Sequence, residues 1–252
     1  MSFHPGRAVA SIAVVLASGF GGGIQIADVE IPRPVPESSC LVIGFLGGRD
    51  AWDDSSKGVR QLALGLRSEG LLAETFENRR RSVALEVVRD ALDRNGDGAI
   101  DRQEGGTVQN GQNVRLVVYG QSWGGAAVVK FARELNELGV SIELTVQIDS
   151  VGRDDALIPA NVRSAANLYQ TDGWFLDGEH PIRAEDPEAT RILGNWRFDY
   201  SEPPGSEISL DGVPWWKLAF RIPHARMDRD PEVWARVEEL IQGACHPAAL
   251  DR

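Results

Sequence analysis

The chain has 252 residues, which fits one large domain, and its apolar content of 42% excludes a fibrous or disordered protein. Its 37 Asp and Glu residues outnumber 26 Lys and Arg residues, so the formal net charge is -11. A surface this acidic repels phosphate backbones, and we therefore expect no nucleic-acid partner.

The first 23 residues are expected to be a secretory signal peptide. Arg7 precedes an apolar run at 8–20, and three glycines follow at 21–23. A positive region, an apolar core and small residues in this order are typical of a signal peptide. The run is too short for a membrane span, so we expect no transmembrane span in the mature chain. A buried N-terminal helix or strand is the alternative. The signal peptide implies a secreted or periplasmic protein, and a Pro-rich linker at 24–39 follows it.

Strands and helices then alternate along the chain. Apolar runs predict strands at 40–45, 71–76, 114–119, 142–148 and 165–170, and helical periodicity predicts helices at about 56–68, 82–92, 125–138 and 231–242. This alternation predicts the α/β class, with a mainly parallel sheet covered by helices on both faces. The strand at 142–148 carries Glu143, Thr145 and Gln147 at alternate positions, which predicts a place near the sheet edge.

A Gly-x-Ser-x-Gly motif runs from Gly120 to Gly124, between a predicted strand and a predicted helix. A sharp turn at this point lifts the Ser122 hydroxyl above the sheet, and the glycines let the strand and the helix approach closely. The N-terminus of the helix presents free N–H groups to a developing oxyanion. We therefore predict that Ser122 is a nucleophile; a glycine-rich structural turn is the alternative.

At these residues the sequence resembles the α/β-hydrolase superfamily, and the resemblance covers roughly residues 40–242. It implies a triad in the order Ser, acid, His, and one oxyanion donor on the residue after the nucleophile, Trp123. The second donor comes from the loop after an early strand, here Gly44-Phe45-Leu46-Gly47-Gly48. This run looks like the family's His-Gly-x loop and implies Phe45 N–H as the donor. Ile43 stands where many members carry His, and this leaves Leu46 as the alternative.

His224 is the expected base, because it lies just before the last predicted helix, where the family places its histidine. The other histidines fall in the leader, the lid segment and the tail, namely His4, His180 and His246. Two residues compete for the acid. Asp149 ends the strand after the nucleophile helix, a placement similar to thioesterase-type members. Asp172 follows the next strand, the more usual place in the superfamily. We prefer Asp149 as the acid because it lies directly at the end of a strand, and Asp172 remains the alternative.

Residues 93–104 resemble the calcium loop of an EF-hand at every key position. The ligand positions 1, 3, 5, 7, 9 and 12 fall on Asp93, Asn95, Asp97, the carbonyl of Ala99, Asp101 and Glu104. The residues after the loop are poor helix formers, so no second EF-hand helix is expected. We predict a structural Ca²⁺ site; an Asp/Asn/Gly turn without metal is the alternative.

Cys40 and Cys245 flank almost the whole folded part. In an exported protein such a pair can form a disulfide, here between the first strand and the last helix. Two unlinked thiols are the alternative.

The segment at about 173–222 is rich in aromatic residues, and we predict that it forms a small lid over an apolar acyl group. Four of the seven tryptophans fall in it: Trp174, Trp196, Trp215 and Trp216. Ordinary core packing is the alternative.

The leading functional hypothesis is a serine hydrolase that cleaves a small-molecule carboxylic ester or thioester through an acyl-enzyme on Ser122, without an organic cofactor. An acyltransferase or thioesterase on the same triad is the second hypothesis. A non-catalytic, calcium-stabilised binding module is the third, and the intact Ser/His pair argues against it. The sequence indicates no oligomeric state.

Overall fold

The computed structural model describes residues 31–100, 114–173, 176–201, 208, 210 and 222–246. The signal peptide predicted at 1–23 lies outside these residues. The elements in chain order are β1 (Cys40–Leu46), α1 (Gly58–Ser68), β2 (Leu72–Glu77), the 3-10 turn η1 (Asn78–Arg80), α2 (Arg81–Leu92), β3 (Arg115–Gln121), α4 (Trp123–Glu137), β4 (Ile142–Ile148), β5 (Leu157–Ile158), β6 (Val162–Tyr169), β7 (Arg183–Ala184), β8 (Arg191–Arg197), α6 (Ile222–Met227) and α7 (Pro231–Cys245).

The central sheet has six parallel strands in the order β2-β1-β3-β4-β6-β8. The chain first moves outward from β1 to β2, then crosses to the other side of β1 and continues from β3 to β8. The direction of winding therefore reverses between β1 and β3. In open parallel sheets, ligands bind outside the carboxyl ends of the strands at such a reversal.

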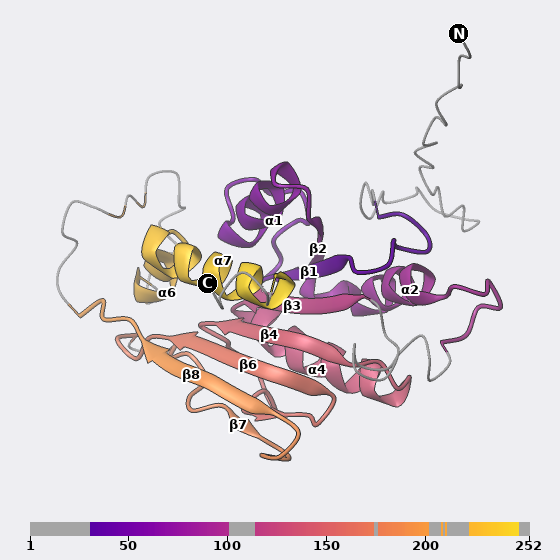
Figure 1. Ribbon diagram of the computed structural model, residues 1–252. Helices are drawn as coiled ribbons and strands as arrows, with labels where there is room; N and C mark the ends of the chain where they lie inside the picture. Colours follow the sequence, from indigo (N-terminus) through magenta and orange to yellow (C-terminus); the bar gives the residue numbers. More distant parts are fainter. Residues whose placement is uncertain are drawn as a thin grey trace, which may run out of the picture.

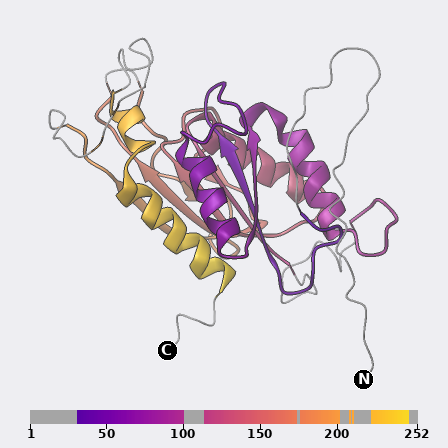
Figure 2. The same ribbon diagram turned by 90° about the horizontal axis from the view of Figure 1, so that it is seen from above.

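Helices cover both faces of this sheet. Helices α2 and α4 pack with one apolar layer, and α1 and α7 pack with the other (Figures 1 and 2). Strands β1 and β3 carry buried apolar side chains on both faces, as a strand covered from both sides requires. The predicted α/β class, with a parallel sheet covered by helices on both faces, is confirmed.

Strand β4 lies inside the sheet, between β3 and β6, and the expectation of an edge position was wrong. Its polar side chains Thr145 and Gln147 are buried. The Gln147 amide donates to the carbonyl of Asp155, at 3.0 Å, in the segment that follows β4. A polar residue is tolerated there because a neighbouring loop accepts its hydrogen bond.

The segment at 173–222 contains a sheet strand, so its description as a lid needs correction. Residues 191–197 form the edge strand β8. Trp196 lies on β8 beneath the guanidinium of Arg236 from α7, 4.8 Å from the ring centroid. Phe198 and the buried Tyr200 also pack on the layer that contains α7. These three aromatic residues serve core packing, whereas Trp174, Trp215 and Trp216 lie outside the described residues.

Both ends of the described chain are attached to the domain. The described part of the predicted linker packs on α2: Val35 is buried, and its N–H donates to Ala91 O at 2.9 Å. Cys40 at the start of β1 and Cys245 at the end of α7 form a disulfide, with Cα atoms 5.4 Å apart. Within the described parts of the chain, no helix is long and apolar enough to cross a membrane.

Candidate active site

Ser122 sits in a strained turn between β3 and α4. Its φ is +59° and its ψ is -124°, a conformation that costs a non-glycine residue about 1–3 kcal/mol. The flanking glycines are needed for steric reasons. A Cβ on Gly120 would overlap the backbone of Gly124, and a Cβ on Gly124 would overlap the carbonyl of Phe45. The motif therefore brings β1, β3 and α4 into close contact around one serine.

Backbone hydrogen bonds hold this turn against β4. The Ser122 N–H donates to Ile148 O at 2.9 Å, and the Ser122 carbonyl accepts from Gly125 N at 2.9 Å and Val151 N at 3.1 Å. The Ser122 hydroxyl makes no hydrogen bond with another described residue. The backbone is thus fixed while the side-chain oxygen stays available for other partners.

His224 and Asp149 meet beside Ser122. His224 Nδ1 lies 2.6 Å from Asp149 Oδ2, and Asp149 is fully buried at the end of β4. A carboxylate only accepts hydrogen bonds, so Nδ1 carries the hydrogen and Nε2 of the neutral ring is an acceptor. Asp149 therefore fixes both the orientation and the tautomer of the ring.

The other ring nitrogen faces the residue next to Ser122. His224 Nε2 lies 3.4 Å from the amide nitrogen Nε2 of Gln121, and no direct hydrogen bond joins His224 to Ser122. Catalytic hydrogen bonds are often long in the free enzyme and tighten when substrate binds. The predicted base thus contacts Gln121, the residue that precedes the predicted nucleophile in the chain.

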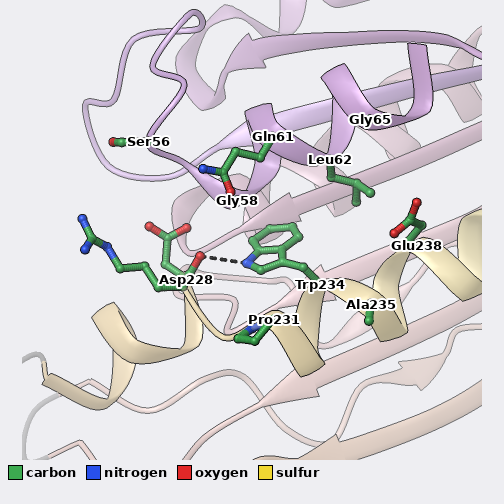
Figure 3. A pocket seen from close by; sticks show the side chains of 11 residues that line it. Ser56, Gly58, Gln61, Leu62, Gly65, Asp228, Pro231, Trp234, Ala235 and Glu238 are labelled. Atoms are coloured by element: carbon green, nitrogen blue, oxygen red, sulfur yellow. Dashed lines mark hydrogen bonds between the residues drawn. The ribbon is translucent and has the colours of Figure 1, made fainter. Parts of the chain in front are cut away.

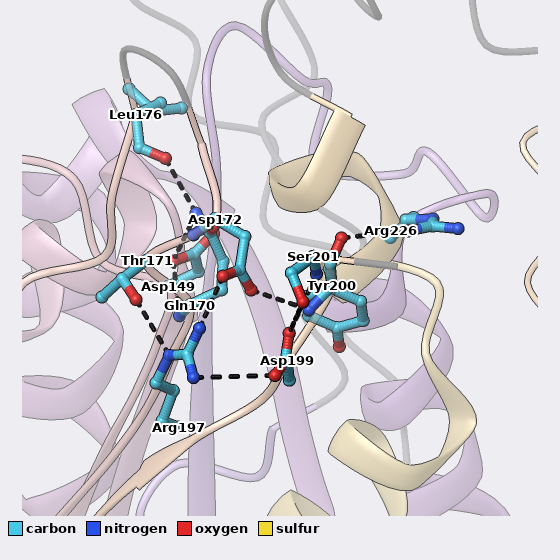
Figure 4. A network of polar contacts seen from close by, with 10 residues as sticks. All are labelled: Asp149, Gln170, Thr171, Asp172, Leu176, Arg197, Asp199, Tyr200, Ser201 and Arg226. Carbon is cyan, nitrogen blue, oxygen red and sulfur yellow. Dashed lines mark hydrogen bonds and ion pairs between the residues drawn. The ribbon is translucent and has the colours of Figure 1, made fainter. Parts of the chain in front are cut away.

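No hydrogen bond or ion pair joins Asp172 to His224; Asp172 instead faces Arg197 and Tyr200 (Figure 4). Its carboxylate pairs with Arg197 Nη2 at 2.5 Å and accepts the backbone N–H of Tyr200 at 2.7 Å. Both bonds hold the chain just after β8 against the loop after β6. The structure thus brings only Asp149 of the two candidate acids to the histidine.

Gln170 is a neighbour of Asp149 that the sequence did not single out. Its Nε2 lies 3.1 Å from Asp149 Oδ2 and 2.8 Å from the carbonyl of Leu176, and its Oε1 accepts the N–H of Asp172 at 2.8 Å. The only signal in the sequence was an amide at the end of a predicted strand, which carries little information. The structure shows a side chain that restrains the buried carboxylate.

The main chain near Ser122 differs from the expected oxyanion loop. Helix α4 begins at Trp123, two residues before the predicted start at 125. Phe45 and Leu46 lie inside β1, where Phe45 pairs with Phe76 and Gly120. Gly44 is paired with Thr75 and Tyr119 within the sheet, and the Tyr119 ring fills the space that a Cβ at this position would need.

The loop residue that approaches the serine is Gly47, the first residue after β1. A Cβ on Gly47 would lie 2.9 Å from Ser122 Cβ and 2.8 Å from Gln121 Oε1. Gly47, two residues after Phe45, is therefore the loop residue that lies against Ser122.

The predicted calcium loop is described as far as residue 100. Both carboxylate oxygens of Asp93 accept backbone N–H groups, from Gly96 and Gly98 at 2.8 Å each. Both glycines have positive φ, +75° and +80°. Asn95 accepts from Asp97 N at 2.8 Å.

Two of the expected calcium ligands, Asp101 and Glu104, lie outside the described residues. Among the described residues, no group of three or more His, Cys, Asp or Glu side chains could hold a metal ion. The half-loop from residue 93 to 100 is nevertheless folded tightly around its first carboxylate.

No protein-family model and no curated protein matches this chain. Among solved structures, the chain is similar to the crystal structure of dienelactone hydrolase from Anabaena variabilis, with 13% sequence identity and a TM-score of 0.38. The superposition covers 81% of this chain and 85% of that chain. At this identity and TM-score, nothing about the chemistry of this chain follows from the likeness.

Proposed function

We propose that this protein is a serine hydrolase that cleaves a carboxylic ester or thioester through an acyl-enzyme on Ser122. The observation that carries the proposal is the 2.6 Å contact between His224 Nδ1 and the fully buried Asp149, beside a serine with positive φ. A nucleophile, a base and an acid that orients the base are the parts that acyl transfer to serine requires.

In the proposed reaction, Ser122 Oγ attacks the carbonyl carbon and passes its proton to His224 Nε2. The tetrahedral intermediate collapses, the carbonyl carbon loses its bond to the leaving oxygen or sulfur, and His224 protonates the leaving group. Water then attacks the acyl carbon and gives a proton to His224. The bond between that carbon and Ser122 Oγ breaks, His224 returns the proton to Oγ, and a carboxylic acid is released. Asp149 stabilises the imidazolium that forms in both halves of the reaction.

We assign the oxyanion donors to the N–H groups of Trp123 and Gly47. Trp123 begins α4, so its N–H belongs to the first helical turn, whose N–H groups lack partners within the helix. Gly47 replaces Phe45 in this role because it follows β1 directly and approaches Ser122. Two donors aimed at the developing negative charge stabilise the transition state more than the bound ester.

The side chains near the triad favour an acyl group with an apolar portion. The Trp123 side chain, adjacent to the nucleophile, is 50% exposed, and Ile222, two residues before His224, is 41% exposed. Exposed large apolar side chains beside a reactive serine offer an apolar surface to a substrate.

A labelling experiment tests the proposal directly. A fluorophosphonate probe should modify the wild-type protein at Ser122 and should not modify Ser122→Ala. Product analysis with p-nitrophenyl butyrate then separates hydrolysis, which gives free butyrate, from transfer to an added alcohol. Absence of labelling in the folded wild type would overturn the proposal and favour a non-catalytic binding module.

We also propose a structural Ca²⁺ site at residues 93–104. The donors are carboxylate, amide and carbonyl oxygens, which suit a hard cation. The described half of the loop supports the proposal, because its backbone N–H groups turn toward the Asp93 and Asn95 side chains. The site would brace the chain before β3, the strand that carries Ser122.

Export of the protein is a further part of the proposal. The leader-like segment at 1–23 and the disulfide between Cys40 and Cys245 both suit an oxidising compartment outside the cytosol. Mass spectrometry of the mature N-terminus tests it, since removal of the leader requires an N-terminus near residue 24.

A further inference from the structure

Lys57 holds a bridging position between two segments of the site. It precedes α1 directly, and its Nζ lies 3.1 Å from Asp50 Oδ2 and 3.3 Å from Asp228 Oδ2. All three side chains are largely buried, with exposed fractions of 21%, 14% and 10%. A cation that contacts two carboxylates at this depth is screened by solvent far less than a surface pair.

The two carboxylates belong to opposite sides of the proposed site. Asp50 N–H donates to Gly47 O at 3.1 Å, so Asp50 closes the turn that holds Gly47 beside Ser122. Asp228 N–H lies 3.3 Å from His224 O, so Asp228 continues the last turn of α6, the helix that carries the base.

The Asp228 end of the bridge is itself anchored. The Asp228 carbonyl accepts a hydrogen bond from Trp234 Nε1 at 2.7 Å, which connects Asp228 to α7. Both residues line a cleft of about 640 Å³ between α1 and α7 (Figure 3). Asp228 thus links Lys57 to α7 as well as to the end of α6.

The bridging lysine is charged at neutral pH. Burial lowers the pKa of Lys57, but the carboxylates of Asp228 and Asp50 raise it by more, so the pKa lies above its ordinary value. A neutral side chain of similar length would leave two carboxylates facing each other without a cation. The bridge therefore depends on the charge of Lys57 and not only on its bulk.

Helix α6 needs such an external tie. It has six residues, and a helix this short has little stability of its own in water. On its inner side, His224 Nε2 contacts Gln121, whose Oε1 also lies close to Gly47. Helix α6 and the Gly47 turn are therefore connected by two side chains, Gln121 near Ser122 and Lys57 farther from it.

We propose that Lys57 is a positioning residue that holds the His224 helix against the Gly47 turn, and so sets the base relative to the nucleophile and the oxyanion donors. The inference rests on the proposed hydrolase function. Lys57 contacts neither Ser122 nor the His224 ring, so its role is separate from the roles proposed for the triad.

The test compares Lys57→Met with Lys57→Arg and with Lys130→Met in the full chain. Lys130→Met removes the same charge from α4, where Lys130 forms no ion pair with a described residue. Fluorophosphonate labelling of Ser122, the kcat and KM for p-nitrophenyl butyrate, and hydrogen exchange are measured well below each unfolding temperature. Lys57→Met should lower kcat and the labelling rate about 10- to 100-fold with little change in KM.

Hydrogen exchange provides a readout that does not need activity. In Lys57→Met, amides of 222–228 should exchange faster while those of α4 keep their wild-type rates. Lys57→Arg should keep most of the wild-type labelling rate and most of the wild-type protection of residues 222–228 from hydrogen exchange. Lys130→Met should change neither quantity. Asp228→Asn combined with Lys57→Met should cost no more labelling rate than Lys57→Met alone, because both changes break one bridge.

The outcomes separate the two proposals. If the wild type is not labelled, the hydrolase function is overturned, and the catalytic role of Lys57 with it. If the wild type is labelled but Lys57→Met reacts at the same rate, or shows unchanged exchange in α6, only the role of Lys57 is overturned.

Discussion

Gln170 donates its side-chain amide to the carboxylate oxygen of Asp149 that also faces His224. Asp149 Oδ2 lies 3.1 Å from Gln170 Nε2 and 2.6 Å from His224 Nδ1. A fully buried carboxylate is costly unless hydrogen bonds satisfy it. Gln170 therefore supplies part of the hydrogen bonding that this buried carboxyl group needs and restrains its rotation.

We expect Gln170→Leu to lower the rate of Ser122 labelling by about 10- to 100-fold, the usual loss when a partner of a site residue is removed. The remaining Asp149 carboxylate would lose a donor and become less able to orient His224. Asn161→Leu is a matched control, because the Asn161 side-chain amide donates to the carbonyls of Ala132 and Val140 and to no atom of the proposed triad. Equal losses of labelling in the two variants would contradict a specific role for Gln170.

The choice of acid gives a second prediction. Asp149→Asn should lower the labelling rate about 10³-fold or more, because an amide can hold the wrong tautomer of His224. Asp172→Asn should leave most of the labelling rate but lower the unfolding temperature, because it weakens contacts to Arg197 and Tyr200. Labelling kinetics and thermal unfolding of both variants check this; the opposite pattern would move the acid to Asp172.

Gly178 packs directly against the proposed acid. A Cβ at this position would overlap Asp149 Oδ1 and would lie 2.9 Å from Tyr169 Cβ. Gly178→Ala should therefore displace Asp149 from His224 and lower the labelling rate clearly. Gly65→Ala in α1 is the control, because its Cβ would meet no atom within 4 Å and Ala is favoured there by up to about 1 kcal/mol. If folded Gly178→Ala is labelled at the wild-type rate, the prediction is contradicted, because Asp149 then keeps its function despite the added Cβ.

The sequence predicted the elements whose patterns are strong and local. The strands at β1, β3 and β4 and the helices α2, α4 and α7 occur where apolar periodicity placed them. Asp230 caps helix α7, since its carboxylate accepts Glu232 N at 2.9 Å, and Pro231 opens the helix. Ser122 and Asp149 were singled out because they fall at the ends of these well-marked elements, whereas His224 was chosen from the place that the resembled family gives its histidine.

The missed features depend on partners distant in the chain. Strand β8 contains Gly194 and Asn195 and has an arginine at each end, so no alternation marks it. Its place is set by pairing with β6. Helix α6 has Pro223 in its first turn and only six residues, too few for a visible period. The resemblance to the family's His-Gly-x loop placed Gly44 and Phe45 in a loop, whereas both residues pair with neighbouring strands inside β1. Phe45 was therefore placed in the wrong structural context.

The calcium proposal gives the last prediction. Calcium that binds only the folded chain stabilises it by about 2.7 kcal/mol at a concentration 100 times the Kd. Removal by a chelator should then lower the unfolding temperature of the wild type by about 5–10 °C. Asp93→Asn should lose most of this difference, because Asp93 occupies the first ligand position and organises the loop.

Asp90→Asn is the matched control for Asp93→Asn. It removes the same charge three residues earlier, from the end of α2, where Asp90 pairs with Arg33 at 2.7 Å on the surface. A surface pair contributes about 0–1 kcal/mol, so this variant should keep the full response to chelation. Calorimetry with and without calcium measures both. An equal chelator-induced shift in the wild type and in Asp93→Asn would refute a calcium site at this loop, because the response would then come from elsewhere in the chain.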